Sequence, residues 1–338
     1  MTVQLLSDKE IWDTFVDESP SGLLFHKWDY LTITGKHTGY TFLPYGVYKG
    51  DELICLYPLF QKRIHGVNAV FSPPPLTVIP HLGCVMGREF GGLKQSKKET
   101  FLKLVADEMR QEIAGLSPNY ISITLVPDFL DIRQFIWDGF STSIHYSYAV
   151  NLEKSLDELW GDLHYKLRNK LKKAAKADMQ LVKSNDLSAF YTLLSERYSD
   201  PALDIPVIDR AYLTDLMQAY PENIGLYYLY DAAGDVAGFV TTQEYKKFLL
   251  WIGTPRLETP LAGNEYLQWL LIEKAKAEGY RQLENMGANN KDLVFFKSKF
   301  NPDLLIYFEI SKKDRLGAVT EWAYLNLVKK MMMRTGRV

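Results

Sequence analysis

The chain has 338 residues, of which 47% are hydrophobic and 24% charged, and its formal net charge at pH 7 is −2. This length allows two domains, and the near-neutral charge excludes a general attraction to DNA or to anionic membranes. Cys55 and Cys84 are the only cysteines, which excludes a disulfide framework and a zinc cluster. No signal sequence, membrane span or metal motif is apparent, so we expect a cytoplasmic protein without a bound metal.

The first 150 residues predict a mixture of helices and strands. Ser7 and Glu10 have the spacing of a capping box, which predicts a helix start. Repeated prolines exclude a helix over 72–84 and predict an extended loop. The other elements are a helix (7–17), a hairpin (41–48 with 52–60), a helix (95–114) and two strands (119–126 and 147–152).

The stretch 155–177 predicts one amphipathic helix with strongly basic faces. Ser155 and Glu158 form a second capping-box pattern at its start. Apolar residues recur at helical spacing and predict a buried stripe; they are Trp160, Leu163, Leu167, Leu171 and Ala174. The other faces carry Lys166, Arg168, Asn169, Lys170, Lys172, Lys173 and Lys176.

Like charges on this helix stand four residues apart, as in Arg168 and Lys172. Each such pair costs an isolated helix roughly 0.2–0.5 kcal/mol. A bound anion would remove that cost, and a plain solvated basic face is the alternative interpretation. Because the whole chain is nearly neutral, the pattern favours a defined anionic ligand over a bulk polyanion.

The second half predicts an alternation of helices and strands. Gly279 has the position of a C′ glycine that ends the helix before it. In chain order we expect a strand (179–183), two helices (186–199 and 207–219), a three-stranded meander (224–231, 235–245 and 247–253), a helix (264–278), a strand (280–284), a short helix (291–299), a strand (304–311) and a C-terminal helix (318–333).

This order of elements resembles the GNAT acyltransferase fold, and the first half resembles a reduced copy of it. The predicted fold class is therefore α/β, with mixed α+β sheets in tandem GNAT-like (acyl-CoA N-acyltransferase) domains. We expect a degenerate GNAT-like domain over residues 1–150 and a GNAT-like domain with the basic helix and the C-terminal helix over 151–338.

Three segments resemble FemAB-like acyltransferases, which include the Fem enzymes that form peptidoglycan bridges. Residues 166–176, Lys-x-Arg-Asn-Lys-x-Lys-Lys-Ala-x-Lys, are similar to the family's RN-x-I-x-K-A-x-K signature. Residues 296–300, Phe-Lys-x-x-Phe, match its FK-x-x-F motif. Residues 135–140, Phe-Ile-Trp-Asp-Gly-Phe, with Tyr146 and Tyr148, are similar to the segment between the family's domains.

The resemblance implies transfer of an aminoacyl or acyl group to an amine of a phosphate-bearing cell-envelope precursor. It places the acceptor's phosphate on Lys166, Arg168, Asn169 and Lys172. No tightly bound cofactor is implied, and the co-substrate is aminoacyl-tRNA or acyl-CoA. The chain departs from true Fem enzymes in lacking a long helical arm, which puts a tRNA contact by that arm in doubt.

The expected donor loop departs from an acetyl-CoA cradle. Such cradles use closely spaced glycines before a helix, so that backbone N–H groups hold a pyrophosphate. Here Arg256 stands seven residues before Gly263 and Asn264, with Glu258 and Pro260 between. We predict donor contacts at Arg256, Gly263 and Asn264, with weak or no acetyl-CoA binding.

Acyl transfer to an amine needs a neutral amine, an activated acyl group and donors for the developing oxyanion, but no protein nucleophile. Lys297 is the candidate oxyanion donor, and a solvated surface lysine is its plain alternative. Glu244 and Glu284 are candidate bases, although a plain hydrogen-bonded carboxylate is the commoner role.

Three functions stay open on the sequence. The leading one is the FemAB-like acyltransferase; the alternatives are a CoA-dependent N-acetyltransferase of an amino sugar or small amine, and a non-catalytic GNAT-fold protein that binds an anionic ligand. The C-terminal helix combines apolar residues with lysines and arginine, so at most a peripheral membrane contact is expected there. No DNA partner is expected.

Overall fold

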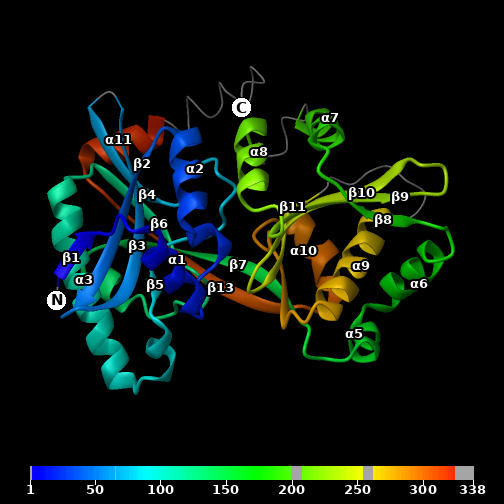
Figure 1. Cartoon of the computed structure of the whole chain (residues 1–338), viewed down its shortest axis with the longest axis horizontal. Coiled ribbons are helices and arrows are strands. Elements are labelled where there is room, and N and C mark those ends of the chain that lie inside the picture. Colours follow the sequence, from blue (N-terminus) through cyan, green and yellow to red (C-terminus); the bar gives the residue numbers. More distant parts are fainter. Residues whose placement is uncertain (1, 65, 199–207, 254–261, 324–338) are drawn as a thin grey trace. The chain divides into compact units, whose positions relative to one another are not determined.

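The computed structural model describes the chain except residues 1, 65, 199–207, 254–261 and 324–338 (Figure 1). Contacts divide the chain into two compact units. The first comprises Met1–Ile144, Asp204–Tyr212 and Tyr307–Val338, and the second comprises His145–Leu203 and Leu213–Ile306. Both contain mixed sheets with helices against them, which confirms the predicted fold class.

The sheet of the first unit contains one parallel pair of strands in an otherwise antiparallel arrangement. Its order is β1 (Thr2–Leu5), β2 (Thr41–Lys49), β3 (Glu52–Ile64), β4 (Val67–Ser72), β6 (Tyr120–Thr124) and β13 (Asp303–Lys313), and β5 (Val85–Met86) pairs with β3. Strands β4 and β6 are parallel. Strand β13 joins β6 from Glu309 to Lys313, so the end of the chain returns to the first unit although the sequence assigned it to the second domain.

Helices cover both faces of this sheet. Helices α3 (Gln95–Leu116) and α4 (Arg133–Trp137) contribute Leu102, Met109 and Phe135 to a core shared with Tyr57 and Val47 of the strands. On the other face, α1 (Lys9–Glu18) and α2 (Trp28–Thr38) pack aromatic rings on the sheet, with ring centroids 5.3–5.8 Å apart; the rings belong to Trp12, Trp28, Phe42 and Phe60. Helix α11 (Arg315–Ala323) follows β13.

The sheet of the second unit repeats this design. Its order is β7 (Ser141–Asn151), β12 (Gln282–Asn285), β11 (Phe248–Gly253), β10 (Val236–Glu244), β9 (Ile224–Tyr230) and β8 (Gln180–Lys183). Strands β11 and β12 are parallel and are connected through α9 (Gly263–Ala277), whereas the other neighbours are antiparallel. The predicted meander is thereby confirmed.

The helices of the second unit position the candidate site. Figure 1 shows α6 (Tyr165–Ala174) and α9 on one side of the sheet and α7 (Leu187–Tyr198) on the other. The remaining helices are α5 (Leu156–Asp162), α8 (Arg210–Ala219) and α10 (Lys291–Lys297). Leu167 and Leu171 of α6 join a core with Leu271 of α9 and Leu283 of β12. None of the helices in the described ranges is long and apolar enough for a membrane span.

Several local predictions were wrong. The stretch 155–177 forms two helices, because the backbone turns at Leu163 and His164 and the His164 imidazole caps the second helix by accepting from Lys166 N–H at 3.2 Å. The first helix is capped by Asp8 rather than Ser7. Helix α2 and strands β1 and β4 were not predicted.

Other local predictions held. Gly279 is the C′ residue of α9 with φ +84°, and the Ser155–Glu158 capping box is present. The helix expected over 318–333 begins at Arg315, and its part from residue 324 on lies outside the described residues.

Candidate active site

The two helices of the basic segment bury the expected apolar stripe. Leu163, Leu167, Leu171 and Ala174 are each at most 3% exposed. Helix α5 ends where the Leu163 N–H donates to Trp160 O at 3.3 Å, and α6 begins at the His164 cap. The stripe therefore continues across the break, and the basic side chains remain on the outer faces.

Arg168 has a structural contact that the sequence did not predict. Its Nη1 donates to the carbonyl oxygen of Gly161 and, at 3.0 Å, to that of Leu163. These carbonyls are at the end of α5, where an intrahelical donor is lacking. The guanidinium thus holds the α5–α6 turn, and only its other nitrogens are left for a ligand.

The other predicted anion-binding side chains are solvent-exposed. Lys166, Asn169 and Lys172 project from α6. Lys170 is different, because its Nζ forms an ion pair at 2.8 Å with Glu265 in the first turn of α9. This ion pair connects the basic helix with the helix that follows the expected donor loop.

The start of α9 is packed too closely on β10 for any residue but glycine. A Cβ at Gly263 would overlap the carbonyl oxygen of Ala237. A Cβ at Gly238 would lie 3.1 Å from Asn264 Oδ1. Gly263 and Asn264 are therefore anchored in the second unit, while Arg256 lies outside the described residues.

Lys297 is the last residue of α10, and its neighbours anchor that helix. The rings of Phe296 and Phe300 meet edge to face with centroids 6.1 Å apart, and both pack against the core of the second unit. The Lys297 ammonium lies over Gly287, where an added Cβ would be 3.2 Å from Nζ. Gly287 has φ +95°, so glycine supplies both the turn and the space for the lysine.

Burial changes the acid–base chemistry of Lys297. Desolvation lowers the pKa of Lys297 from 10.5 to about 8. In the described part of the chain its ammonium has neither a hydrogen-bond partner nor a carboxylate partner. At neutral pH the side chain is still mostly charged, so it can stabilise developing negative charge in a site of low polarity.

The structure joins the two strongest sequence motifs. The carbonyl oxygen of Lys299, two residues after Lys297, accepts from the N–H of His164 at 2.9 Å. The segment that carries Lys297 is thus hydrogen-bonded to the start of the basic helix. The candidate acyl-transfer lysine and the candidate anion-binding helix belong to one connected part of the second unit.

The two candidate bases are buried carboxylates with existing hydrogen bonds. Glu244 Oε1 accepts from Tyr227 Oη at 2.7 Å and from Thr242 Oγ1 at 2.8 Å, which gives this carboxylate a structural role. Glu284 is 2% exposed and accepts from Ser147 Oγ at 2.8 Å. These bonds favour the plain hydrogen-bonded role for both carboxylates.

Comparison with known proteins gives a family match within the second unit. Residues 161–297 match the family model of an acetyltransferase (GNAT) domain, a range that begins at the end of α5 and ends at Lys297. No curated protein sequence matches the chain.

Solved structures give the fold of the whole chain. FemX has a TM-score of 0.68 at 13% identity, over 91% of this chain and 97% of that one. The C-terminal domain of a putative lysylphosphatidylglycerol synthetase from Agrobacterium fabrum has a TM-score of 0.55 at 12% identity, over 97% of both chains. A tandem GNAT protein from the clavulanic acid biosynthesis pathway has a TM-score of 0.50 at 11% identity, over 92% of this chain and 98% of that one.

Residues 161–297 therefore match a GNAT acetyltransferase domain, and the whole chain shares its fold with FemX and with a tandem GNAT protein. The predicted likeness to FemAB-like acyltransferases is confirmed at the level of the fold, by the GNAT match within the second unit and by the structural likeness of the whole chain to FemX.

Two site residues were not predicted. His164 follows the C-cap of α5, caps the start of α6 and donates its N–H to the segment that carries Lys297. Gly287 provides the space for the ammonium. Gly287 lies in a polar stretch directly after a strand, a position where a positive φ is common, and this was the available signal.

Proposed function

We propose that the protein transfers an aminoacyl or acyl group to an amine of a phosphate-bearing cell-envelope precursor, with Lys297 stabilising the oxyanion. The observation that carries this proposal is the half-buried Lys297 side chain, whose ammonium lies over Gly287 in a segment hydrogen-bonded to the basic helix. The likeness to FemX and to a lysylphosphatidylglycerol synthetase supports aminoacyl transfer, since both names belong to envelope biosynthesis.

The proposed reaction is direct attack of the acceptor amine on the donor's acyl carbonyl. The neutral amine forms the new C–N bond, the carbonyl oxygen gains negative charge, and the bond to the leaving oxygen or sulfur then breaks. The Lys297 ammonium stabilises charge that exists only near the transition state, so it lowers the barrier rather than tightening substrate binding. The amine's proton leaves with solvent or with the departing group.

The exposed cations of α6 form the proposed acceptor-binding face. Lys166 and Lys172 are exposed, and Asn169 lies between them in sequence. Arg168 contributes through the nitrogens that do not hold the α5–α6 turn. A phosphate on this face would bring the rest of the acceptor toward the start of α6, where the Lys297 segment is bonded.

A second candidate is CoA-dependent N-acetylation of an amino sugar or small amine. Two observations favour it: the family model that matches is described as an acetyltransferase, and a tandem GNAT protein shares the fold. The start of α9 favours the aminoacyl donor over acetyl-CoA. Its glycine, Gly263, is needed for close packing against Ala237 rather than for a phosphate cradle.

One experiment separates the donors. The full chain would be incubated with labelled acetyl-CoA and, separately, with pools of charged tRNA, each with muropeptide precursors as acceptors. We expect label transfer from charged tRNA and little from acetyl-CoA. Transfer from acetyl-CoA alone would establish the second candidate, and transfer from neither donor would contradict the proposed acceptor class.

A further inference from the structure

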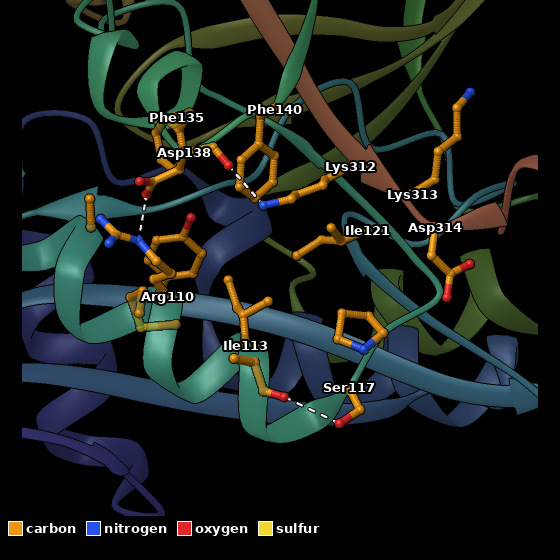
Figure 2. Close-up of a pocket in the computed structure, with 15 residues that line it drawn as sticks. Arg110, Ile113, Ser117, Ile121, Phe135, Asp138, Phe140, Lys312, Lys313 and Asp314 are labelled. Atoms are coloured by element: carbon orange, nitrogen blue, oxygen red, sulfur yellow. Dashed lines mark hydrogen bonds and ion pairs between the residues drawn. The ribbon is translucent and has the colours of Figure 1, made fainter. Parts of the chain in front are cut away.

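A pocket of about 360 Å³ lies in the first unit, and its lining includes none of the candidate acceptor-binding, donor-binding or catalytic residues. Its walls come from α3, α4, β6 and β13, and Figure 2 shows them as sticks. The walls are largely apolar, with Met109, Ile121 and Phe135 among them. The ring of Phe140 completes an aromatic wall, since its centroid is 5.8 Å from that of Phe135. This volume suits a small organic molecule.

Three cations line the pocket, and they differ in their partners. Arg110 forms an ion pair with Asp138 at 2.8 Å, and Lys313 forms one with Glu321. Lys312 has no carboxylate partner among the described residues. Its Nζ donates to the carbonyl oxygen of Asp138 at 2.8 Å and lies 5.6 Å from the Phe140 ring centroid. Figure 2 shows this ammonium beside the Phe140 ring, with Lys313 directed elsewhere.

A side chain with a buried hydroxyl lines the same pocket. Tyr57 is 1% exposed and lines the pocket, and its hydroxyl has no hydrogen-bond partner in the described ranges. Leaving such a group unsatisfied costs about 1–3 kcal/mol. Burial raises the pKa of Tyr57, so the hydroxyl is a proton donor at neutral pH.

We propose that this pocket binds a small aromatic carboxylate that carries an oxygen at the end opposite its acid group. The carboxylate binds Lys312, whose ammonium has spare donors and no counter-ion. The ring packs against Phe135 and Phe140, for which aromatic rings have favourable edge and face geometry. The far oxygen accepts from Tyr57 after a small adjustment of the side chains that cover the hydroxyl.

The test uses three matched ligands and isothermal titration calorimetry on the full chain. Phenylacetate lacks the far oxygen, 4-hydroxyphenylacetate has it, and 4-hydroxyphenylacetamide lacks the charge. We expect 4-hydroxyphenylacetate to bind about threefold to tenfold more tightly than phenylacetate, the value of one neutral hydrogen bond. The acid should bind about tenfold more tightly than the amide.

Two variants assign these preferences to residues. Tyr57→Phe should abolish the preference for the hydroxyl and keep that for the acid. Lys312→Gln should abolish the preference for the acid and keep that for the hydroxyl. Lys313→Gln is the control, because Lys313 is the next residue and is neutralised by Glu321, so both preferences should persist.

The proposal is overturned if none of the three ligands binds. It is also overturned if the two ratios stay unchanged in Tyr57→Phe and Lys312→Gln, because the ligand would then bind elsewhere. Thermal melting checks that the variants fold: Lys312 is exposed, and Tyr57→Phe removes only an unsatisfied hydroxyl.

Discussion

The two units share one arrangement, a parallel pair of strands connected through a helix and followed by a short helix. They differ in the side chain at the end of that short helix. In the first, the parallel pair β4 and β6 is connected through α3, and the short helix α4 comes next. In the second, the parallel pair β11 and β12 is connected through α9, and the short helix α10 comes next. Helix α4 ends at Trp137, which is 67% exposed, whereas α10 ends at Lys297, which is half-buried and whose ammonium is partly desolvated.

We interpret this difference as that between a reactive copy and a reduced one. A buried ammonium without a counter-ion is costly, and such groups concentrate at functional sites. In the first unit, the Tyr57 side chain lines a pocket and buries a neutral hydroxyl that has no hydrogen-bond partner in the described residues. A hydroxyl can hold a ligand but supplies no charge for acyl transfer. The comparison therefore supports the proposals that place chemistry in the second unit and ligand binding in the first.

Replacing Lys297 by Met is the most severe test of this comparison. We expect turnover to fall by about 10²–10³, the usual effect of losing one oxyanion donor. Acceptor affinity should change little, because the ammonium acts on charge in the transition state. Stability should rise by about 1–3 kcal/mol, because the variant no longer buries a charge. Steady-state kinetics and thermal melting measure the two effects.

Lys299→Met is the matched control. Lys299 lies two residues on, and its described contact with the basic helix is made by the backbone carbonyl, which the substitution keeps. It should retain most of the activity. Equal losses in the two variants would show that Lys297 takes no part in the chemistry.

The pH dependence tests whether the ammonium or the free amine of Lys297 is active. Its pKa is about 8, so an oxyanion donor loses activity as pH rises through 8, whereas a general base would gain it. Stability should change in the opposite direction. Between about pH 8 and 10.5 the unfolded chain binds more protons than the folded one, so the free energy of unfolding rises with pH.

Both pH effects should be absent in Lys297→Met, which is measured beside the wild type. Activity that instead appears above pH 8 would make Lys297 the base and leave the oxyanion donor to be sought elsewhere.

Substitutions of Arg168 and Lys172 compare a structural cation with an exposed one on the basic helix. Arg168→Gln should lower stability by about 1–2 kcal/mol, because two carbonyls at the end of α5 lose a charged donor. Lys172→Gln should leave the melting temperature within error, since Lys172 is exposed. Both should weaken binding of a phosphorylated acceptor severalfold, measured by titration. Unchanged binding in Lys172→Gln would mean that α6 is only a solvated basic face.

The sequence predicted those parts of the second unit whose signals are local. Helical periodicity identified the apolar stripe from Leu163 to Ala174, and alternating apolar runs identified the meander. The motif around Lys297 identified the residue that the structure buries. What it could not predict is how segments far apart in sequence meet, such as His164 N–H with Lys299 O.

The first unit was harder because tertiary contacts override local propensity there. Helix α2 contains threonines and Gly35, which are poor helix formers, and was missed for that reason. In the structure the hydroxyls of Thr34 and Thr38 donate to carbonyls one turn earlier, and Gly35 allows the close approach of Tyr40 O. The repeated design was predicted from the order of elements alone, and strand pairing shows where the corresponding strands and helices lie in each unit.

Tyr57→Phe gives the smallest expected effect and tests the first unit alone. In the absence of ligand, the hydroxyl loses its hydrogen bonds to water on folding and gains no partner among the described residues. Its removal should therefore stabilise the chain by about 1 kcal/mol. Tyr227→Phe is the contrasting variant, because the Tyr227 hydroxyl donates to Glu244 at 2.7 Å, and its loss should destabilise by about 1–2 kcal/mol. Chemical denaturation of both variants measures the difference in sign. Destabilisation by Tyr57→Phe would mean that its hydroxyl is satisfied by water in solution, and the floor of the pocket would then be polar and occupied rather than open to a ligand oxygen.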